Sequence, residues 1–554
     1  MGWADLAQSL DANMSTPLPQ SRTIAALIRE QSRRYAQQEA LVAGDVRLTY
    51  AQLRDEVLRT ARALAALGVR RGDHVAILMG NRPEWVLSFL ALQQLGAVSV
   101  GLNTWATPRE LEFAMSHAEI SCLIAVDVFR RSNYRAVLAD MAPHAQRLPK
   151  LRRTVWLSAD AANPAQLDES SGEISWSDMI FGAQAVSEAQ VELAAQQVQP
   201  DDVGMLLYTS GSTATPKGIL LQQSQWITNS FHIGERQHVT HQDRVWLAVS
   251  LFWSFGCVNA LPNMLTHGGC IVLQEHFDAG QALALIEQER CSIVYVTPNM
   301  VQAMWDHPDR PHRNLSSLRS GATIGTPEQL AQVVALGARQ ICNVYGLSET
   351  YGNCSVIDAA EPVDLRMQCV GEPLPGVTAR ICGIETGQTL GAGMVGEIRV
   401  RGPLFLAYYK EPEKTRESYD EDGFFRTGDL GLMDEQGRLY YRGRLKEMIK
   451  SGGINIAPIE VEEILMSHPR VLTAYVIGVP HPTLDEALVA IIIAKPDMLV
   501  DAAELKSFCQ RELSAYKVPS RFHFTTADRL PLTTTGKLQK MKLHTLLDPQ
   551  ETML

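Results

Sequence analysis

The sequence predicts an α/β protein with a large N-terminal domain of parallel αβ sheets plus a small β-barrel, followed by a compact α+β C-terminal domain. Three observations predict this fold class. From about Arg22 to Cys291, helical patterns alternate with short apolar strands, which is typical of a parallel sheet covered by helices. After about Val370, glycines and prolines separate short strands, which favours a small antiparallel barrel. Near Glu447 the pattern changes again to that of a compact α+β unit.

The predicted elements follow from hydrophobic periodicity. The N-terminal part is predicted to contain a helix at 50–67, a strand at 74–79, a helix at 84–95, a strand at 98–101, a helix at 279–290 and a strand at 293–297. Later strands are predicted at 396–401, 438–442, 472–479 and 487–494, with helices at 458–467 and 502–513. We place the domains at 1–443 and 447–554, with a hinge at 444–446.

Composition narrows the functional classes. The 554 residues exceed the size of one hydrophobic core, and 46% hydrophobic with 20% charged residues is usual for a folded soluble protein. The net charge of −11 gives no basic footprint for nucleic acid. Nine cysteines without a C-x-x-C pair indicate buried free thiols in a reducing compartment. The first twenty residues lack the pattern of a signal peptide, so we expect the cytoplasm.

Two segments resemble motifs that they do not form. Residues 245–265 are apolar enough to suggest a membrane span, but polar residues and Pro262 interrupt them, which favours a buried strand and helix. The sequence GAGMVG at 391–396 fits the glycine pattern of a dinucleotide-binding loop. That loop must follow a strand and open a helix, whereas here a strand follows, so we predict a hairpin turn.

The strongest local signal is YTSGSTATPKG at 208–218. Its hydroxyls, its glycine and the cation Lys217 suit a polyphosphate. It is not a Walker A loop, because Pro216 stands where that pattern needs glycine before lysine. A polar surface turn is the alternative for such a cluster alone. The flanking apolar strand and the Pro-Lys-Gly ending favour phosphate binding.

Four weaker motifs follow along the chain. In NVYGLSET at 343–350, Glu349 suits Mg²⁺ and Tyr345 offers a face to a base. In FRTGDLG at 425–431, Asp429 suits the hydroxyls of a ribose. GRLKEMIKSGGINIAPIEVEE at 443–463 joins the cations Arg444, Lys446 and Lys450 to a double glycine. LPLTTTGKLQK at 530–540 carries Lys537 in a polar loop. Taken singly, each of these is more often a solvated loop.

Together and in this order, the five motifs resemble the superfamily of adenylate-forming (ANL) enzymes, which includes acyl-CoA synthetases, peptide-synthetase adenylation domains and beetle luciferases. The resemblance extends from LTYAQL at Leu48 to Lys540. It implies a large N-terminal domain and a mobile C-terminal domain. It also implies ATP, Mg²⁺ and coenzyme A as ligands and a small-molecule carboxylic acid as substrate. A homodimer is an open option. From the charge and the apolar pattern we expect no nucleic acid as partner and no transmembrane segment.

The resemblance also implies a role for each matching residue. Lys537, Lys217, Glu349 and Lys450 would be catalytic, with Glu349 also the metal ligand, and Lys446 would be the hinge. The nucleotide would be bound by Thr209, Ser210, Gly211, Ser212, Thr213, Ala322, Thr323, Asn343, Tyr345, Gly346, Ser348, Asp429 and Arg444. The acyl and thiol pocket would contain Phe252, Trp253, Phe255, Gly321, Gly452, Gly453 and Asn455.

The chemistry agrees with these roles. A carboxylate is a poor electrophile, so it first attacks the α-phosphate of ATP and forms an acyl-adenylate, with release of pyrophosphate. The enzyme must hold two anions together while charge builds at phosphorus, which requires Mg²⁺, hydroxyls and lysines. A thiol must then reach the same carbonyl, and a hinged domain can exchange the two sets of groups.

Departures from the family pattern bear on the substrate. Ala214 stands where glycine is usual, and Ser348 where threonine is usual. Trp253 stands where many acyl-CoA synthetases have histidine at the boundary of the acyl and thiol sites, although packing in the core would also explain it. No Asp lies between Leu247 and Asn263 to pair an amino acid's ammonium. Aromatic and apolar residues bordering the family's pocket favour a bulky apolar or aromatic acid: Trp226, Phe231, Phe252, Trp253, Phe255 and Met300.

Three alternatives stay open. The acyl group could be loaded onto the phosphopantetheine of a carrier protein, as in acyl-AMP ligases. Luciferase-like oxidation of the adenylate is less favoured. A non-catalytic nucleotide-binding homologue is disfavoured because Lys217, Glu349, Asp429, Arg444 and Lys537 are all retained. The preferred hypothesis is an AMP-forming acyl-CoA synthetase of fatty acid metabolism.

Overall fold

The computed structural model describes residues 16–141, 144–158, 167, 172–209, 216–451, 454–481, 484–496, 498–513, 515–532 and 538–547. For Thr209 and Asn455 it describes the backbone alone. Contacts divide the chain into two compact units, one of residues 1–377 with 401–419 and one of residues 378–400 with 420–554. The hinge that we predict at 444–446 lies inside the second unit.

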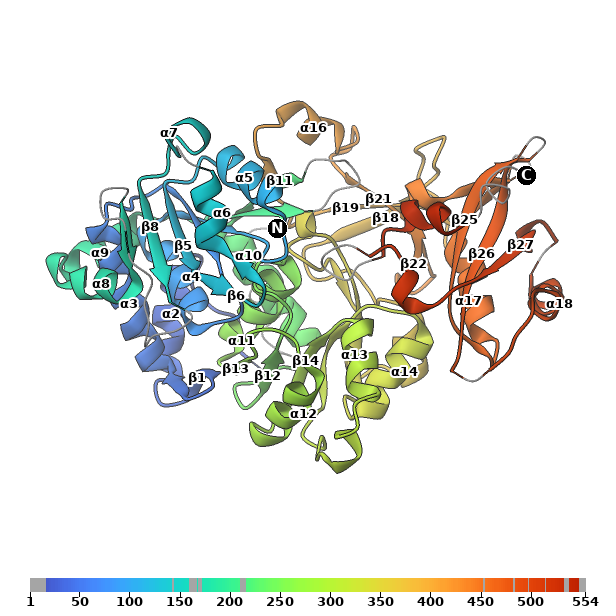
Figure 1. Cartoon of the computed structure of the whole chain (residues 1–554), viewed down its shortest axis with the longest axis horizontal. Coiled ribbons are helices and arrows are strands. Elements are labelled where there is room, and N and C mark those ends of the chain that lie inside the picture. The colour runs from blue at the N-terminus through green and yellow to red at the C-terminus, as the bar shows by residue number, and fades with distance from the viewer. Residues whose placement is uncertain are drawn as a thin grey trace. The chain divides into compact units, whose positions relative to one another are not determined.

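The first unit is built on two eight-stranded, mostly parallel sheets (Figure 1). One has the order β17-β16-β15-β14-β12-β13-β1-β2, and the other β20-β11-β10-β4-β3-β5-β8-β9. The strands of the first sheet are β1 Glu39–Ala43, β2 Val46–Thr49, β12 Arg244–Leu247, β13 Cys270–Leu273, β14 Ile293–Val296, β15 Ser320–Thr323, β16 Gln340–Tyr345 and β17 Ser355–Val356. Those of the second are β3 His74–Leu78, β4 Val98–Gly101, β5 Cys122–Val126, β8 Arg153–Leu157, β9 Glu173–Ser175, β10 Val203–Thr209, β11 Lys217–Gln222 and β20 Ala407–Tyr408. Antiparallel pairs lie at both ends of the first sheet and at one end of the second. The other strand pairs are parallel, so the predicted α/β class is confirmed.

Helices of the first unit cover these sheets (Figure 1). They are α2 Ile24–Arg34, α3 Tyr50–Ala66, α4 Pro83–Leu95, α5 Pro108–His117, α6 Tyr134–Asp140, α7 His144–Arg147, α8 Trp176–Phe181, α9 Glu188–Gln197, α10 Gln223–Arg236, α11 Leu261–His267, α12 Ala279–Gln288, α13 Pro298–Trp305, α14 Pro327–Leu336, α15 Val363–Gln368 and α16 Pro412–Glu417. Local sequence sets their ends. Thr49 and Gln52 form a capping box at the start of α3, and Gly96 ends α4 in the left-handed region with φ 67°.

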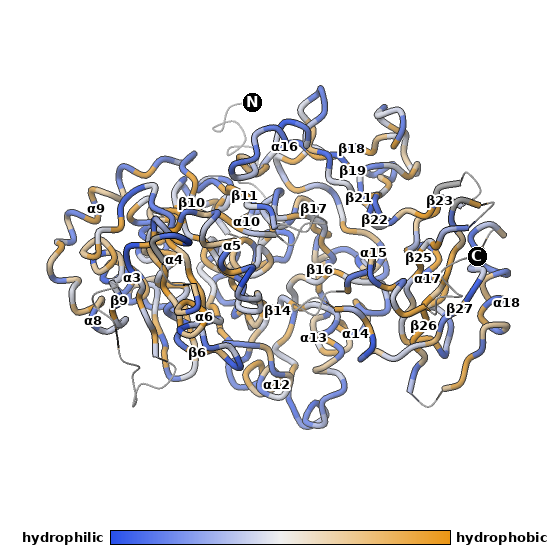
Figure 2. The backbone as a smooth tube through the Cα atoms, turned by 45° about the horizontal axis from the view of Figure 1, so that its top comes forward, coloured by the Kyte–Doolittle hydropathy of each residue, from blue (hydrophilic) through white to orange (hydrophobic). Residues whose placement is uncertain are grey.

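The second unit contains two further sheets, coloured yellow to red in Figure 1. A four-stranded sheet stands where the small barrel is predicted, with β18 Thr378–Cys382, β19 Gly396–Arg401, β21 Phe425–Met433 and β22 Leu439–Arg444 in that order. The other sheet has the order β24-β23-β26-β25, with β27 beside β26; its elements are β23 Ile449–Ser451, β24 Ile454–Ile456, β25 Val471–His481, β26 Asp485–Ala494, β27 Arg521–Phe524, α17 Pro458–Ser467 and α18 Ala502–Glu512. Figure 2 shows the hydrophobic residues concentrated along β25 and β26, and their inward side chains pack with Val461, Leu465 and Leu505.

The two segments that resemble a membrane span and a dinucleotide-binding loop fold as predicted. Residues 391–396 form a turn that leads into β19, and Gly393 has φ 76°. The apolar segment at 245–265 contains the end of β12, a π-helix at Phe255–Ala260 and the start of α11. In the part of the chain that the structure describes, no helix has the length and apolarity to cross a bilayer.

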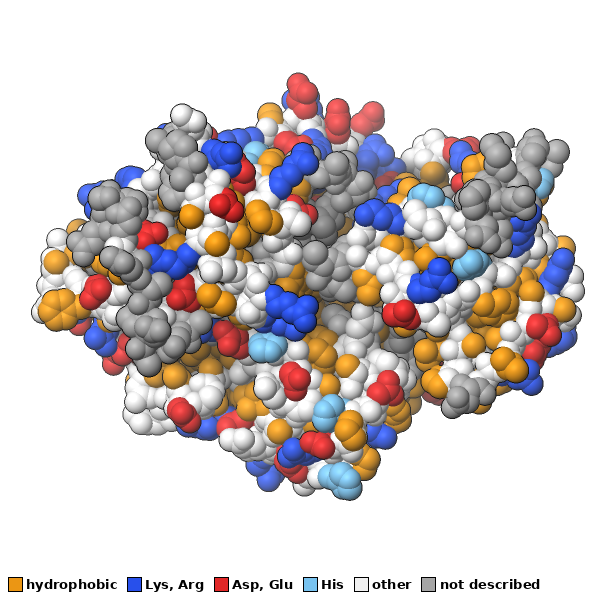
Figure 3. Space-filling view, in the orientation of Figure 1, with side chains coloured by type: hydrophobic (Ala, Val, Ile, Leu, Met, Phe, Trp, Pro, Cys, Tyr) orange, Lys and Arg blue, Asp and Glu red, His pale blue; other side chains and the backbone are white. Residues whose placement is uncertain are grey.

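All nine cysteines are buried and free, as the composition predicts. Burial raises the pKa of Cys122, Cys270 and Cys342 to about 12, so these thiols stay protonated at neutral pH. On the face seen in Figure 3, the described basic and acidic side chains are interspersed, in agreement with the modest net charge.

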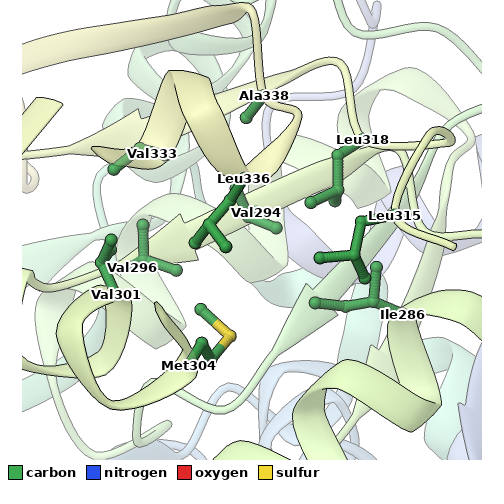
Figure 4. Close-up of a pocket in the computed structure, with 10 residues that line it drawn as sticks. All are labelled: Ile286, Val294, Val296, Val301, Met304, Leu315, Leu318, Val333, Leu336 and Ala338. Atoms are coloured by element: carbon green, nitrogen blue, oxygen red, sulfur yellow. The ribbon is translucent and has the colours of Figure 1, made fainter. Parts of the chain in front are cut away.

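A small apolar void of about 10 Å³ lies in the core between β14 and the helices α12, α13 and α14 (Figure 4). Side chains such as Val296, Met304 and Leu336 point into it. It is lined by apolar atoms and has room for about one water molecule, so it is a packing defect and not a substrate site.

Candidate active site

The phosphate motif connects two antiparallel strands of the first unit. Tyr208 pairs with Gly218 and Thr209 pairs with Lys217, so β10 leads into the motif and Lys217 begins β11. Ser210, Gly211, Ser212 and Thr213 lie outside the described residues. A Cβ on Gly218 would lie 2.9 Å from the Leu206 side chain and 3.2 Å from that of Tyr409, so glycine permits close packing here.

A histidine contacts the strand that leads into this motif. The Tyr208 hydroxyl and the His117 Nδ1 lie 2.8 Å apart, and Phe113 stacks on the His117 ring. Burial raises the pKa of Tyr208 and lowers the pKa of His117, so both groups are held neutral. Sequence reasoning missed His117, because nothing in the local pattern of α5 connects it to a strand ninety residues later.

The second motif continues from β16 into a 3₁₀ turn at Ser348–Thr350. Asn343 and Tyr345 are buried at the end of β16, and Glu349 is only 9% exposed. Tyr351 follows with φ 53°, a left-handed conformation that is unusual for a bulky residue. The Asn229 Nδ2 donates to the Asn353 carbonyl at 2.8 Å and to that of Tyr351 at 3.2 Å, which holds the turn in this shape.

Tyr408 connects the first two motifs. Its hydroxyl donates to the Glu349 Oε1 at 2.8 Å, and the Lys217 Nζ lies 4.9 Å from the centroid of its ring. Sequence reasoning missed this tyrosine. The signal that could have found it is weak: LAYY at 406–409 is a short apolar and aromatic run between glycine- and proline-rich loops.

The segment Gly321–Thr323, predicted to line the adenine and acyl pockets, lies in strand β15. Gly321 has φ 137°, and a Cβ there would lie 1.9 Å from the Val294 carbonyl oxygen, so no other residue fits. In the parallel pairing of β15 with β16, Thr323 lies beside Asn343 and Ala322 beside Cys342. Two of the predicted nucleotide residues are therefore neighbours at the carboxyl ends of adjacent parallel strands, where ligands of α/β sheets usually bind.

An aromatic cluster occupies the predicted acyl segment. The Trp105 ring lies 5.1 Å from Phe252 and 5.1 Å from Trp253, edge to face in both cases. The Ser348 hydroxyl donates to the Ser254 hydroxyl at 3.1 Å, so the cluster adjoins the nucleotide motif. Sequence reasoning did not single out Trp105, since it lies far from Trp253 in the chain.

Not every aromatic residue of the predicted pocket is exposed toward it. Trp226 is 1% exposed and donates its indole N–H to the Cys257 carbonyl at 2.9 Å, and Phe231 stacks on His267. These two are core residues. Trp253 and Phe255 are partly exposed, and a π-helix begins at Phe255, a distortion often found at functional sites.

In the second unit, the predicted ribose ligands pair with each other. Asp429 on β21 faces Arg444 on β22 in the strand register, and the Arg444 Nε lies 3.0 Å from the Asp429 Oδ1. Asp429 is 1% exposed. The predicted hinge residue Lys446 follows in a 3₁₀ turn, Leu445–Glu447.

The remaining predicted residues belong to the second unit. Lys450 is exposed on β23, opposite Asn455 in the register of β24. Gly452, Gly453 and Lys537 lie outside the described residues. The residues on either side of the Lys537 segment are held in place: Leu532 and Leu538 form an antiparallel bridge, and the Lys540 Nζ contacts the Glu462 Oε1 at 2.5 Å.

The carboxylate of Glu349 suits a hard cation that also binds the phosphates of the substrate. Among the described residues, no group of three or more His, Cys, Asp and Glu side chains could hold a metal ion by itself. Mg²⁺ commonly takes one or two carboxylates and completes its shell with phosphate oxygens and water. The buried carboxylate of Glu349, whose partner Tyr408 also contacts Lys217, fits that pattern.

Comparisons with known proteins show the family of the chain. The AMP-binding enzyme family matches residues 28–409, and its C-terminal domain matches residues 460–537. The chain is 31% identical to the mitochondrial medium-chain acyl-CoA ligase ACSF2 of Bos taurus, over 95% of this chain and 87% of the relative. It is 33% identical to the acyl-CoA ligase SID4 of Ajellomyces capsulatus, over 95% of this chain and 91% of the relative.

A solved structure shares the fold. The crystal structure of the anthranilate CoA ligase AuaEII in complex with anthranoyl-AMP superposes with a TM-score of 0.82 at 27% identity, and it covers 95% of this chain and 98% of that chain. The chain therefore belongs to the adenylate-forming superfamily of AMP-binding enzymes. Within it, the chain is an AMP-forming acid–thiol ligase that activates a carboxylic acid with ATP to an acyl-adenylate, releases pyrophosphate and transfers the acyl group to coenzyme A.

Proposed function

We propose that the acid is a bulky hydrophobic carboxylic acid. The observation that carries this proposal is the position of the aromatic cluster of Trp105, Phe252 and Trp253. A hydrogen bond from Ser348 to Ser254 joins this cluster to the nucleotide motif. Adenylation requires the carboxylate to lie against the α-phosphate, so an apolar wall beside that motif suits an apolar acyl chain. The medium-chain acid in the name of one relative and the aromatic acid of the solved ligase support the same class.

In the first half-reaction, a carboxylate oxygen forms a bond to the α-phosphorus, and the bond from that phosphorus to the bridging oxygen breaks. Pyrophosphate leaves with the electron pair. Lys217 and the hydroxyl-rich loop bind the phosphates, Glu349 holds Mg²⁺, and Lys537 offsets the charge that builds between carboxylate and phosphate. Bound Mg²⁺ supplies positive charge to the phosphate oxygens. Asn343, Tyr345, Asp429 and Arg444 bind the nucleoside.

In the second half-reaction, the thiol sulfur forms a bond to the acyl carbonyl carbon, the carbon–oxygen bond to AMP breaks, and the thiol proton passes to solvent. The domain of residues 447–554 pivots at Lys446 and exchanges Lys537 for the segment that contains Lys450, Gly452, Gly453 and Asn455. The buried free thiols support a reducing compartment, and we assign the cytoplasm.

A screen of acids tests the substrate class. Purified protein is incubated with ATP, Mg²⁺ and one acid from a series of short aliphatic, medium-chain, aromatic and polycyclic acids, and pyrophosphate release is measured with CoA or with a phosphopantetheine carrier protein. We expect turnover for apolar acids of medium size or larger, and with CoA. A preference for acetate or for a charged acid, or turnover only with the carrier protein, would contradict the proposal.

Trp253→Ala in the same screen tests whether the aromatic cluster sets the preference for the acyl chain. We expect the optimum to move to larger acids, with about a tenfold change in the ratio of kcat/KM between two acids that differ by a few methylenes. Trp226→Phe is the matched control, because Trp226 is a core residue. A loss of thermal stability without a change of selectivity would assign Trp253 to packing.

A further inference from the structure

One tyrosine contacts two oppositely charged residues that come from separate motifs. Tyr408 is 4% exposed, and its hydroxyl donates to the Glu349 Oε1 at 2.8 Å. The ammonium of Lys217 lies over the face of the same ring, 4.9 Å from its centroid. Both contacts have the geometry of attractive interactions: a hydrogen bond to a carboxylate, and a cation on an aromatic face.

The backbone around this tyrosine is fixed on both sides. Strand β20 pairs with β11, which places Tyr408 opposite Ile219, two residues after Lys217. The Tyr408 N–H donates to the Thr415 Oγ1 at 3.0 Å. The Phe405 N–H donates to the Glu349 carbonyl at 2.8 Å, so the backbone and the side chain of Glu349 are both tied to residues 405–408.

This arrangement brings two opposite charges to one side chain without letting them neutralise each other. In the part of the chain that the structure describes, Lys217 and Glu349 form no ion pair, although both contact the same side chain. A direct pair would occupy the ammonium that should meet phosphate and the carboxylate that should meet a cation. The ring of Tyr408 lies against one charge, and its hydroxyl orients the other.

We propose that Tyr408 is a positioning residue of the ATP–metal site: it holds the carboxylate of Glu349 for the divalent cation and keeps the Lys217 ammonium free for the phosphates. This inference rests on the proposed roles of Glu349 and Lys217. Tyr408 acts through these two residues and touches no reacting atom.

The test measures cation binding instead of turnover. Free Mn²⁺ is followed by electron paramagnetic resonance while full-length protein is added in the presence of a non-hydrolysable ATP analogue. Tyr408→Phe keeps the ring and removes the hydroxyl, so we expect Mn²⁺ binding in the ternary complex to weaken about tenfold. We expect affinity for the ATP analogue without metal to stay unchanged. Tyr408→Leu also removes the ring and should weaken both.

The neighbouring tyrosine provides the matched control. The Tyr409 ring contacts His74 and His117, so Tyr409→Phe removes one hydroxyl from the adjacent residue without touching Glu349. We expect its Mn²⁺ affinity to equal that of the wild type. If Tyr408→Phe binds Mn²⁺ as tightly as Tyr409→Phe does, the proposal is wrong.

A double-mutant comparison separates positioning from general support of the fold. In a Glu349→Gln background, adding Tyr408→Phe should weaken Mn²⁺ binding no further, because its effect acts through the carboxylate. A second tenfold loss would show that Tyr408 acts elsewhere. Should Tyr408→Phe fail to fold, a crystal structure of the wild type with Mg²⁺ and the analogue decides: a Tyr408 hydroxyl turned away from a metal-bound Glu349 overturns the proposal.

The outcomes distinguish this inference from the proposed function. Wild-type protein that binds neither the ATP analogue nor Mn²⁺ would overturn the roles of Lys217 and Glu349 and, with them, this inference. Wild-type protein that binds both, with Tyr408→Phe indistinguishable from it, would overturn the role of Tyr408 alone.

Discussion

At the scale of single residues, the surroundings of a side chain decide between structural and chemical roles that the sequence leaves open. Trp226 and Trp253 are both aromatic residues of the predicted acyl segments. Trp226 is enclosed and bonded to a backbone carbonyl, whereas Trp253 is partly exposed beside the nucleotide motif. Asp429 could have been an ordinary turn former, but it is buried in an ion pair with Arg444 across two strands.

The role of Lys537 gives a prediction at this scale. Lys537→Ala should lower acid-dependent exchange of pyrophosphate into ATP by a factor of about 10² to 10³, because it removes one charge that stabilises the transition state. Turnover of supplied acyl-adenylate with CoA should stay nearly unchanged. The exposed Lys542, replaced by alanine, is the control. Equal loss in both half-reactions would contradict the assignment.

At the scale of elements, short strands and turns matter more for the site than long helices do. Strand β20 has only two residues, yet its pairing with β11 places Tyr408 next to that strand and in contact with Glu349. At one edge of the other eight-stranded sheet, an ion-pair network stabilises the hairpin of β1 and β2. Arg47 bonds both Glu39 and Glu289, and Arg244 bonds the same two carboxylates.

This network predicts a specific acid lability. Hydrogen bonds from Arg47, assisted by Arg244, lower the pKa of Glu39 from 4.5 to about 2, and Arg47 also lowers the pKa of Glu289. As the pH falls below about 4.5, the unfolded chain binds protons that the folded chain does not, so stability is lost progressively toward pH 2. Above pH 5 the contribution is complete.

Thermal melts between pH 6 and pH 3 measure this effect. Glu39→Gln should lower the Tm at pH 6 and flatten its decline with falling pH, since one of the linked carboxylates is gone. Glu188→Gln is the control: its carboxylate also faces an arginine, Arg62, but it is 66% exposed. The same slope in both variants would exclude the network as the cause.

At the scale of the whole molecule, the two-step chemistry requires one active site to present two sets of groups. The chain forms two compact units, and the second contains Asp429, Arg444, Lys446 and Lys450. Residues on either side of the Lys537 segment are fastened inside this unit, since Lys540 contacts Glu462 and lies 3.8 Å from Glu447, the residue after Lys446. The Lys537 segment should therefore move together with the residues that follow the hinge.

A change at the hinge tests this movement. Lys446→Pro restricts φ at the pivot and should slow thioester formation far more than adenylation. Lys446→Ala removes the side chain, keeps the backbone free and should behave like the wild type. Rapid-quench measurements of adenylate and thioester in a single turnover resolve the two steps. An unchanged rate of thioester formation in Lys446→Pro would remove Lys446 as the pivot.

The sequence by itself determined the class, most elements and the motifs. The predicted strand at 98–101 and helix at 458–467 match β4 and α17, because periodicity, caps and turn residues are local properties. Only the tertiary structure decided which distant residues meet. Tyr408 and Glu349 are 59 residues apart and Arg47 and Glu289 are 242 apart. Such contacts depend on strand order and packing, which no local pattern encodes. Nothing in the sequence therefore connects His117 or Trp105 to the site, and the aromatic run around Tyr408 is only a weak signal.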